Sequence, residues 1–353
     1  MFCAKTSDYL SPRRVDIYLT RHCNLSCPFC FYNDCRRGFG GNAGDDAPLE
    51  AWMGLLDELE KLQVLEVGLM GGEALLFNGF WSIIDRLAHG MMRFALFSNG
   101  VLLDDDVVKR LAASRRCTYV QISIDGTEKR HDAIRGEGVY SHAIAAMRRL
   151  QAASVPLHVN MVLTKGSASD IAEEARHLLE DVGVKYIRIN PVSGDKSLRL
   201  DESDMAEAIQ ILMPLREKFP DALKGTGVFK YLSSLKKPFV PTADKPCPNC
   251  EKMLGIRCSI MADGSVIPCI DAENAVIGNA FQTSFADLWH SEILRKMRKS
   301  VLVPRELPRP ECAECRFAGN CRQNCLSSAT LCEDRICYRR LDEQLQKRGI
   351  AIH

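Results

Sequence analysis

The sequence predicts an α/β protein with an open, partial (β/α)6 barrel, followed by a small cysteine-rich region. From residue 14 to about residue 219, short apolar and β-branched runs alternate with longer amphipathic runs, which is the pattern of a parallel sheet covered by helices. Six units are fewer than the eight of a closed TIM barrel. Beyond residue 236 the periodicity weakens, and ten of the sixteen cysteines follow residue 246.

Each predicted strand is a short apolar run with β-branched or aromatic residues. In chain order, the strands are expected at residues 15–19, 64–70, 94–98, 119–124, 157–163 and 185–190. Amphipathic stretches between them predict helices, including residues 49–62, 104–113, 140–153 and 170–182. Ser167 and Ser169 precede the last of these helices and are of a residue type that commonly caps a helix N-terminus.

Cysteine-rich or glycine-rich segments follow the first four predicted strands. They are the cysteine loop after residue 19, Gly71-Gly72-Glu73, Ser98-Asn99-Gly100 and Asp125-Gly126. In barrels and in open parallel sheets, ligands bind at the carboxyl ends of the strands. The sequence therefore predicts a binding site at the mouth of the barrel.

The charge balance excludes some classes of partner. Lysine and arginine number 46 and aspartate and glutamate 45, for a formal net charge of +1, so no global field favours nucleic acid or an anionic membrane. Residues 1–14 mix polar and charged types, and no apolar run reaches the length of a membrane-spanning helix. We therefore expect a cytoplasmic protein that binds neither nucleic acid nor a membrane.

A shift in composition predicts the domain boundary. Residues 236–248 are rich in proline and lysine and have no clear period, which is typical of a linker. We expect one domain at residues 1–235 and a second at residues 236–353. Sixteen cysteines in a 353-residue chain without an export signal favour thiolate ligation of metal over a disulfide framework, and metal ligation would order the second domain.

Three cysteines, Cys23, Cys27 and Cys30, share the loop after the first strand. A structural zinc site has four protein ligands, whereas a [4Fe-4S] cluster held by three thiolates leaves one iron open for a substrate or cofactor. His22 could be a fourth zinc ligand, but adjacent residues rarely both reach one metal ion. The loop therefore favours the cluster over zinc.

With Phe29 directly before the last cysteine, this loop resembles the defining motif of the radical S-adenosylmethionine (SAM) superfamily. The resemblance implies an enzyme whose open iron binds the amino and carboxylate groups of SAM. One electron from the cluster then cleaves a carbon-sulfur bond to give a 5′-deoxyadenosyl radical, which abstracts hydrogen from the substrate. Such a reactive species requires an enclosed site, and a barrel mouth provides one.

The resemblance extends to the other strand ends. Gly71-Gly72-Glu73 is similar to the motif that binds the methionyl amine of SAM, and glycine permits a close approach to the backbone. The residues that resemble contacts to the ribose and carboxylate of SAM are Ser98, Asn99, Ser123, Asp125 and Arg135. Arg135 suits a carboxylate because its guanidinium presents a fork of donors. Taken singly, each residue also fits a structural role; their joint placement favours SAM.

The cysteines Cys312, Cys315, Cys321 and Cys325 are separated by two, five and three residues. Spacing alone also fits a zinc ribbon. After a radical SAM loop, the run resembles the SPASM extension, which implies two auxiliary [4Fe-4S] clusters and three clusters in all. The implied ligands of the first are Cys258, Cys269, Cys325 and Cys250, the last in preference to Cys247. Those of the second are Cys312, Cys315, Cys321 and Cys337, the last in preference to Cys332.

The resemblance implies an oxidoreductase that oxidatively modifies a side chain of a peptide or protein, as in the crosslinking of ribosomally synthesised peptides (RiPPs). A general base would remove a proton from the substrate, and Tyr32 and Asp271 are the candidates. The alternatives are formylglycine formation, as in anaerobic sulfatase maturases, and dehydrogenation of a small molecule. Met70 and Ile270 stand where sulfatase maturases have glutamine and aspartate, which counts against formylglycine formation.

The implied partners are a peptide or protein substrate and an electron donor of the flavodoxin or ferredoxin type. The basic residues 295–299 could dock an acidic donor, although such a run is more often a solvated helix face. About a dozen residues precede the first predicted strand. Recognition of a leader peptide would therefore need a separate leader-peptide-binding protein, or the enzyme uses none.

Overall fold

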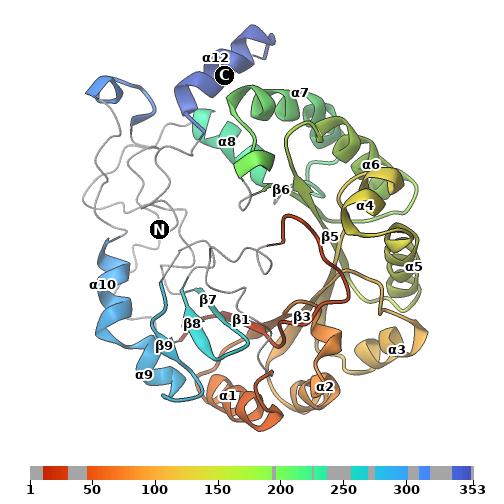
Figure 1. Cartoon of the computed structure of the whole chain (residues 1–353), viewed down its shortest axis with the longest axis vertical. Coiled ribbons are helices and arrows are strands. Elements are labelled where there is room, and N and C mark those ends of the chain that lie inside the picture. Colours follow the sequence, from red (N-terminus) through yellow and green to blue (C-terminus); the bar gives the residue numbers. More distant parts are fainter. Residues whose placement is uncertain are drawn as a thin grey trace.

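The computed structural model describes residues 11–30, 46–192, 196–224, 226–236, 256–268, 275–300, 310–318 and 336–350. Strands line the inside of an open arc and helices cover its outside (Figure 1). The strands of this part of the chain form one nine-stranded sheet with the order β6-β5-β4-β3-β2-β1-β7-β8-β9. The predicted α/β class and partial barrel are confirmed.

The first six strands form a continuous parallel sheet. They are β1 (Arg14–Tyr18), β2 (Glu66–Met70), β3 (Arg93–Ser98), β4 (Cys117–Ser123), β5 (Leu157–Leu163) and β6 (Ile187–Pro191). Parallel neighbours need crossover connections, which helices provide here. The six strands predicted from the sequence are confirmed, with ends shifted by at most two residues.

Helices cover the outer face of this sheet (Figure 1). They are α1 (Leu49–Lys61), α2 (Phe80–His89), α3 (Asp105–Ala113), α4 (Glu128–Arg135), α5 (Val139–Ala152), α6 (Ala168–Glu180), α7 (Glu202–Lys218) and α8 (Gly227–Lys236). Of the two serines expected to cap α6, Ser167 is the N-cap residue, whereas the expectation for Ser169 was wrong. The helix begins two residues earlier than expected, so Ser169 lies inside it, and the Ser167 hydroxyl bonds the backbone of Thr164 instead of a helix N–H.

The sheet continues past β1 in strands that the sequence did not predict. β7 (Arg257–Ile260) pairs in parallel with β1, and β8 (Ser265–Ile267) and β9 (Gly278–Asn279) add antiparallel neighbours. The helices α9 (Phe285–Trp289), α10 (Glu292–Ser300) and α12 (Tyr338–Lys347) follow. The predicted linker falls almost wholly outside the described residues, so the boundary after residue 235 stays a prediction.

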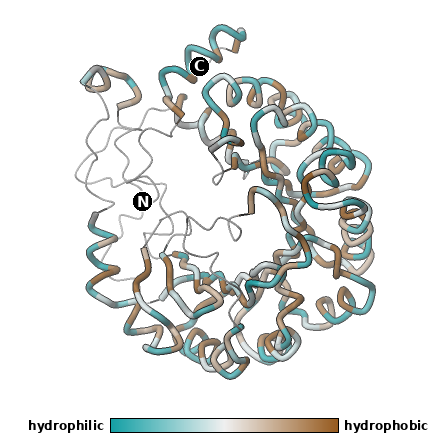
Figure 2. Tube along the Cα trace, in the orientation of Figure 1, coloured by the Kyte–Doolittle hydropathy of each residue, from teal (hydrophilic) through white to brown (hydrophobic). Residues whose placement is uncertain are grey.

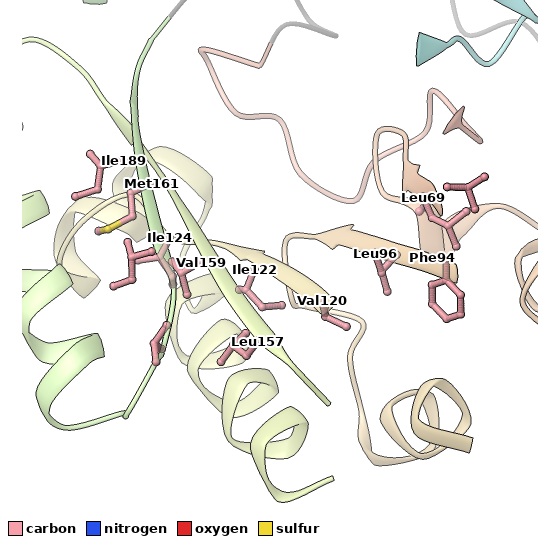
Figure 3. Close-up of a cluster of buried hydrophobic side chains, with 14 of the residues drawn as sticks. Leu69, Phe94, Leu96, Val120, Ile122, Ile124, Leu157, Val159, Met161 and Ile189 are labelled. Atoms are coloured by element: carbon pink, nitrogen blue, oxygen red, sulfur yellow. The ribbon is translucent and has the colours of Figure 1, made fainter. Parts of the chain in front are cut away.

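Alternate residues of each strand form the core between sheet and helices. Val15, Ile17 and Leu19 are fully buried. Figure 3 shows the same layer on the neighbouring strands, including Leu69, Phe94, Leu96, Ile122 and Val159. In Figure 2 hydrophobic segments gather on the strands and on the inner sides of the helices. Each buried aliphatic or aromatic side chain contributes about 1.5–3 kcal/mol, which fixes the strand face that turns toward the helices.

The residues between these core positions face the barrel interior, and many are polar. Asp16 on β1 is 4% exposed and accepts hydrogen bonds from Arg14 Nε, at 2.8 Å, and from Arg257 of β7. Arg14 also donates to the hydroxyl of Tyr119 on β4. A buried carboxylate needs such partners because desolvation of an unpaired charge is costly. The Asp16 ion pairs therefore join β7 to β1 through side chains as well as backbone.

A buried carboxyl between α5 and α6 makes the stability pH-dependent. The Tyr140 hydroxyl donates to Glu174 Oε1 at 2.9 Å, and burial raises the pKa of Glu174 to about 7. The unfolded chain ionises this carboxyl at its ordinary, lower pKa, so stability falls as pH rises through 7. We expect Glu174→Gln to remove about 2 kcal/mol of the stability difference between pH 5 and pH 8.

Anaerobic denaturant titrations at the two pH values measure this difference. The control is Glu173→Gln on the exposed side of the same helix; its charge makes the smallest contribution to the raised pKa of Glu174, so this variant should keep most of the pH dependence. An equal pH dependence in the wild type and in Glu174→Gln would contradict the prediction.

Candidate active site

The loop after β1 carries three cysteine thiols at the mouth of the barrel. Cys27 is buried, Cys30 is half-buried and Cys23 is exposed. The loop is held locally by its own backbone, since Cys30 N donates to Cys27 O at 3.1 Å and Leu25 N donates to Cys23 Sγ at 3.4 Å. Phe29 is half-buried beside them. The structure therefore brings the predicted cysteine loop to the carboxyl end of β1.

The environment of the thiols fits ligation by more than one metal atom. Partial burial raises the pKa values of Cys23 and Cys27, and the charge of Arg135 opposes this rise at Cys27. No three His, Cys, Asp or Glu side chains among the described residues lie close enough to hold a single metal ion. In an iron-sulfur cluster each thiolate binds a different iron, so neighbouring thiols need not converge on one point. Metal binding would displace the thiol protons.

The Gly71-Gly72-Glu73 segment lies against the cysteine loop. Gly72 N donates to Thr20 O and Glu73 N donates to His22 O, both at 2.8 Å. A Cβ atom on Gly72 would lie 2.2 Å from His22 O, and one on Gly71 would lie 2.7 Å from Thr20 O. The two glycines are therefore required for the backbones of the two loops to meet.

We expect Gly72→Ala to destabilise the protein by about 1–3 kcal/mol, because one loop must move away from the other. The matched control is Gly54→Ala in α1, where no atom lies within 4 Å of the new Cβ and where alanine favours the helix by about 0.5–1 kcal/mol. Denaturant midpoints of the two variants should therefore shift in opposite directions. A Gly72→Ala midpoint at or above the wild-type value would refute the close-approach argument.

Glu73 joins the ends of β2 and β3. Its side chain is 1% exposed, and Oε2 accepts from Asn99 N at 2.9 Å and from Ser98 Oγ at 3.1 Å. Burial raises its pKa to about 7, against the effect of these hydrogen bonds. Three of the residues predicted as SAM contacts thus lie together. Their contact with SAM stays a prediction.

Asn99 also links the strand end to the cysteine loop. Its Nδ2 atom donates to Asn24 Oδ1 at 2.8 Å and lies 4.0 Å from Cys23 Sγ. Asn24 was not identified from the sequence. Its position between the cysteines was the available signal, but its partner Asn99, directly after β3, is 75 residues away in the chain, so no local pattern identifies this contact.

Asp125 and Arg135 form a buried ion pair at the end of β4. Arg135 Nε donates to Asp125 Oδ2 at 2.6 Å, and Val162 N donates to Asp125 Oδ1 at 2.8 Å. Asp125 is fully buried. Within the described part of the chain, the terminal guanidinium nitrogens of Arg135 have no hydrogen-bond partner. They are therefore available to an anionic ligand.

His131 supports this pair and was missed in the sequence. It is fully buried on α4, and its Nδ1 atom accepts from Asp125 N at 3.1 Å. Burial, together with the Arg135 charge, lowers its pKa to about 4, so the imidazole is neutral. The Asp125 backbone N–H therefore has a neutral acceptor and no further cation competes with Arg135.

The remaining predicted site residues are placed only in part. Ser123 lies at the end of β4 opposite Asn160 on β5, half-buried. Cys258 lies buried in β7, Cys312 and Cys315 lie in a turn in which Cys315 N donates to Cys312 O, and Cys337 N donates to Glu202 of α7 at 2.9 Å. The candidates outside the described residues are Tyr32, Asp271, Cys250, Cys269, Cys321 and Cys325, with the alternatives Cys247 and Cys332.

Two family models match the chain. Residues 17–179, which contain the three-thiol loop and the strand ends described above, match the radical SAM superfamily. Residues 241–316 match the SPASM model, an iron-sulfur cluster-binding domain. This chain thus contains a radical SAM domain and a SPASM domain. The radical SAM and SPASM resemblances of the sequence are both confirmed. None of the helices in the described residues is long and apolar enough to cross a bilayer.

Several curated proteins are similar to this radical SAM chain. The sporulation killing factor maturation protein SkfB of Bacillus subtilis is 28% identical over 80% of this chain and 65% of its own length. The mycofactocin maturase MftC of Mycobacterium ulcerans is 33% identical over 44% of this chain and 42% of its own length. The chain thus spans less than two thirds of either relative. MftC of Mycolicibacterium smegmatis is 28% identical over 88% of this chain and 77% of its own length.

Solved structures share the fold. Streptococcus suis SuiB bound to the precursor peptide SuiA superposes with a TM-score of 0.73 at 18% identity, covering 94% of this chain and 75% of SuiB. The anSMEcpe structure with AdoMet and a Cp18Cys peptide has a TM-score of 0.70 at 17% identity, covering 95% of this chain and 96% of that one. Both support the radical SAM fold assigned above.

Proposed function

We propose that this radical SAM and SPASM protein cleaves SAM to a 5′-deoxyadenosyl radical and oxidatively modifies a side chain of a ribosomally made peptide, for example by crosslinking. The observation that carries the proposal is the set of three cysteine thiols at the barrel mouth, beside Glu73 and Arg135. The likeness to two maturation proteins and to SuiB, which was solved with a precursor peptide, supports the substrate class.

Cys23, Cys27 and Cys30 would hold a [4Fe-4S] cluster. The donor set fits because thiolates are the usual ligands of such clusters, and the cationic Arg135 near Cys27 offsets their negative charge. When bound, the cluster and SAM together supply the electron and the radical that abstracts a substrate hydrogen. The described residues around them bind and orient SAM.

Each proposed SAM contact follows from a polar group at a strand end. The terminal guanidinium nitrogens of Arg135 would bind the SAM carboxylate, and its Nε contact with buried Asp125 fixes their direction. Glu73 and the Gly71-Gly72 backbone would receive the amine, while Ser98, Asn99 and Ser123 lie where the ribose is expected. Because Glu73, Ser98 and Asn99 are already joined by hydrogen bonds, they need little reorganisation on binding.

Two auxiliary [4Fe-4S] clusters complete the proposal. Of the two proposed ligand sets, the structure describes Cys258 of the first and Cys312, Cys315 and Cys337 of the second. An auxiliary cluster that accepts an electron from the substrate radical would make the reaction a net oxidation. Tyr32 or Asp271 would be the base that removes the proton. We further propose a flavodoxin or ferredoxin as electron donor and, for leader recognition, a separate binding protein.

Mass spectrometry tests the proposed function. The reduced, anaerobically purified protein is incubated with SAM and with synthetic peptides encoded by short reading frames beside its gene. We expect 5′-deoxyadenosine to form together with a peptide that has lost a pair of hydrogen atoms, and neither product without SAM. Conversion of a serine or cysteine to formylglycine would support the activity of an anaerobic sulfatase maturase instead. SAM cleavage with no modified peptide would refute the proposed substrate class.

A further inference from the structure

One cation of α10 points inward, unlike its neighbours. Arg295, Lys296 and Lys299 are exposed, whereas Arg298 is 5% exposed on the side of the helix that also buries Leu294. If this basic run only formed a solvated helix face, all of its charged side chains would be exposed. Burial of a guanidinium is costly unless it meets a compensating group.

The Arg298 guanidinium lacks that compensation among the described residues. Its carbon lies 4.5 Å from the centre of the Trp289 ring, which supports one face of the group. Nε and Nη2 are buried and have no hydrogen-bond partner in the described part of the chain. Among the described residues, no carboxylate forms an ion pair with Arg298. Two N–H donors and the positive charge of Arg298 therefore have no hydrogen-bond or ion-pair partner among the described residues.

The buried thiol of Cys258 lies near this unpartnered cation. On β7, Arg257 turns to Asp16 in the barrel interior, so Cys258, the next residue, turns to the opposite side of the sheet. It is 1% exposed in the same continuous core as Trp289 and Leu294, and α9 and α10 follow β9 at this edge of the sheet (Figure 1). Burial raises the pKa of Cys258, and the charges of Arg298 and Arg257 oppose that rise.

We propose that Arg298 is a positioning residue for the auxiliary cluster bound by Cys258, and that its donors and charge raise the reduction potential of that cluster. The inference rests on the proposed function. Reduction adds negative charge to a cluster, and a buried cation with N–H donors stabilises the more negative state. In the proposed reaction the substrate radical gives one electron to this acceptor and one proton to a base. A higher potential favours the electron transfer.

Redox titration monitored by electron paramagnetic resonance tests the proposal. The full chain with Cys23, Cys27 and Cys30 replaced by alanine is reconstituted anaerobically, so only auxiliary clusters contribute. In this background Arg298→Gln should lower the midpoint potential of one cluster by a tenfold change in its reduction equilibrium, about 59 mV for a one-electron couple. Arg298→Lys, which keeps the charge but loses donors, should fall between. Arg295→Gln removes an exposed charge from the same helix and should not shift the potential.

The outcomes separate this inference from the proposed function. If the background variant binds no iron and sulfide, the auxiliary clusters themselves are refuted. If it binds them and Arg298→Gln leaves both potentials at the values of Arg295→Gln, the role of Arg298 is overturned. Should Arg298→Gln fail to fold, Arg298→Lys decides, and an unshifted potential in that variant overturns the proposal.

Discussion

Cys27→Ala is expected to abolish SAM cleavage and to remove the iron of one cluster from the purified protein. Cys27 is the buried member of the three-thiol loop, and the charge of Arg135 acts directly on it. Partners outside the ligand shell already cost 10–100-fold when they are removed from a metal site, so loss of a ligand should lower the rate by more than about 100-fold. 5′-Deoxyadenosine formation under reducing conditions measures the rate, and iron and sulfide analysis measures the loss.

Cys117→Ala is the matched control. Cys117 begins β4 and is half-buried, so it lies at the end of the strand opposite to the barrel mouth and away from the three-thiol loop. Its replacement should leave SAM cleavage and iron content at wild-type values. Equal iron content and equal cleavage in Cys27→Ala and Cys117→Ala would show that the loop holds no cluster.

The parallel barrel could be predicted because each of its strands is recognisable from the pattern of its own residues. In β5 the buried residues alternate strictly with the half-buried His158, Asn160 and Val162, the first two of which are polar, and such a pattern can be recognised without knowledge of the neighbouring strands. β7 to β9 were missed because they are four, three and two residues long. Segments that short owe their structure to their neighbours in the sheet, and β7 pairs with the edge of β1, which lies about 240 residues away in the chain.

Site residues could be predicted where a polar residue type suited to ligand binding follows the end of a predicted strand. Because the ends of parallel strands meet at one edge, Glu73 and Asn99 could be expected together, and they share a hydrogen bond. His131 and Arg298 could not be identified, because each acquires its significance from burial. A histidine on a helix or an arginine in a basic run has no distinctive sequence pattern, and only the fold shows that its polar atoms are removed from water.

Asp125→Asn is expected to lower stability by about 3–5 kcal/mol, because it leaves the buried Arg135 without its counter-charge. The amide still accepts from Val162 N but removes the negative charge that holds Arg135 Nε at 2.6 Å. The reoriented guanidinium should also bind SAM more weakly. Anaerobic denaturant titration measures the stability, and equilibrium dialysis measures the SAM dissociation constant.

Two further variants separate fold from binding in this pair. Asp106→Asn breaks an exposed contact with Lys109 and should cost less than about 0.5 kcal/mol. Arg135→Lys keeps the charge beside Asp125 but loses the second arm of the fork, so it should retain most of the stability while weakening SAM binding by about 1.5–3 kcal/mol. If Arg135→Lys binds SAM as tightly as the wild type, the carboxylate of SAM is held elsewhere, and Arg135 serves only to neutralise Asp125.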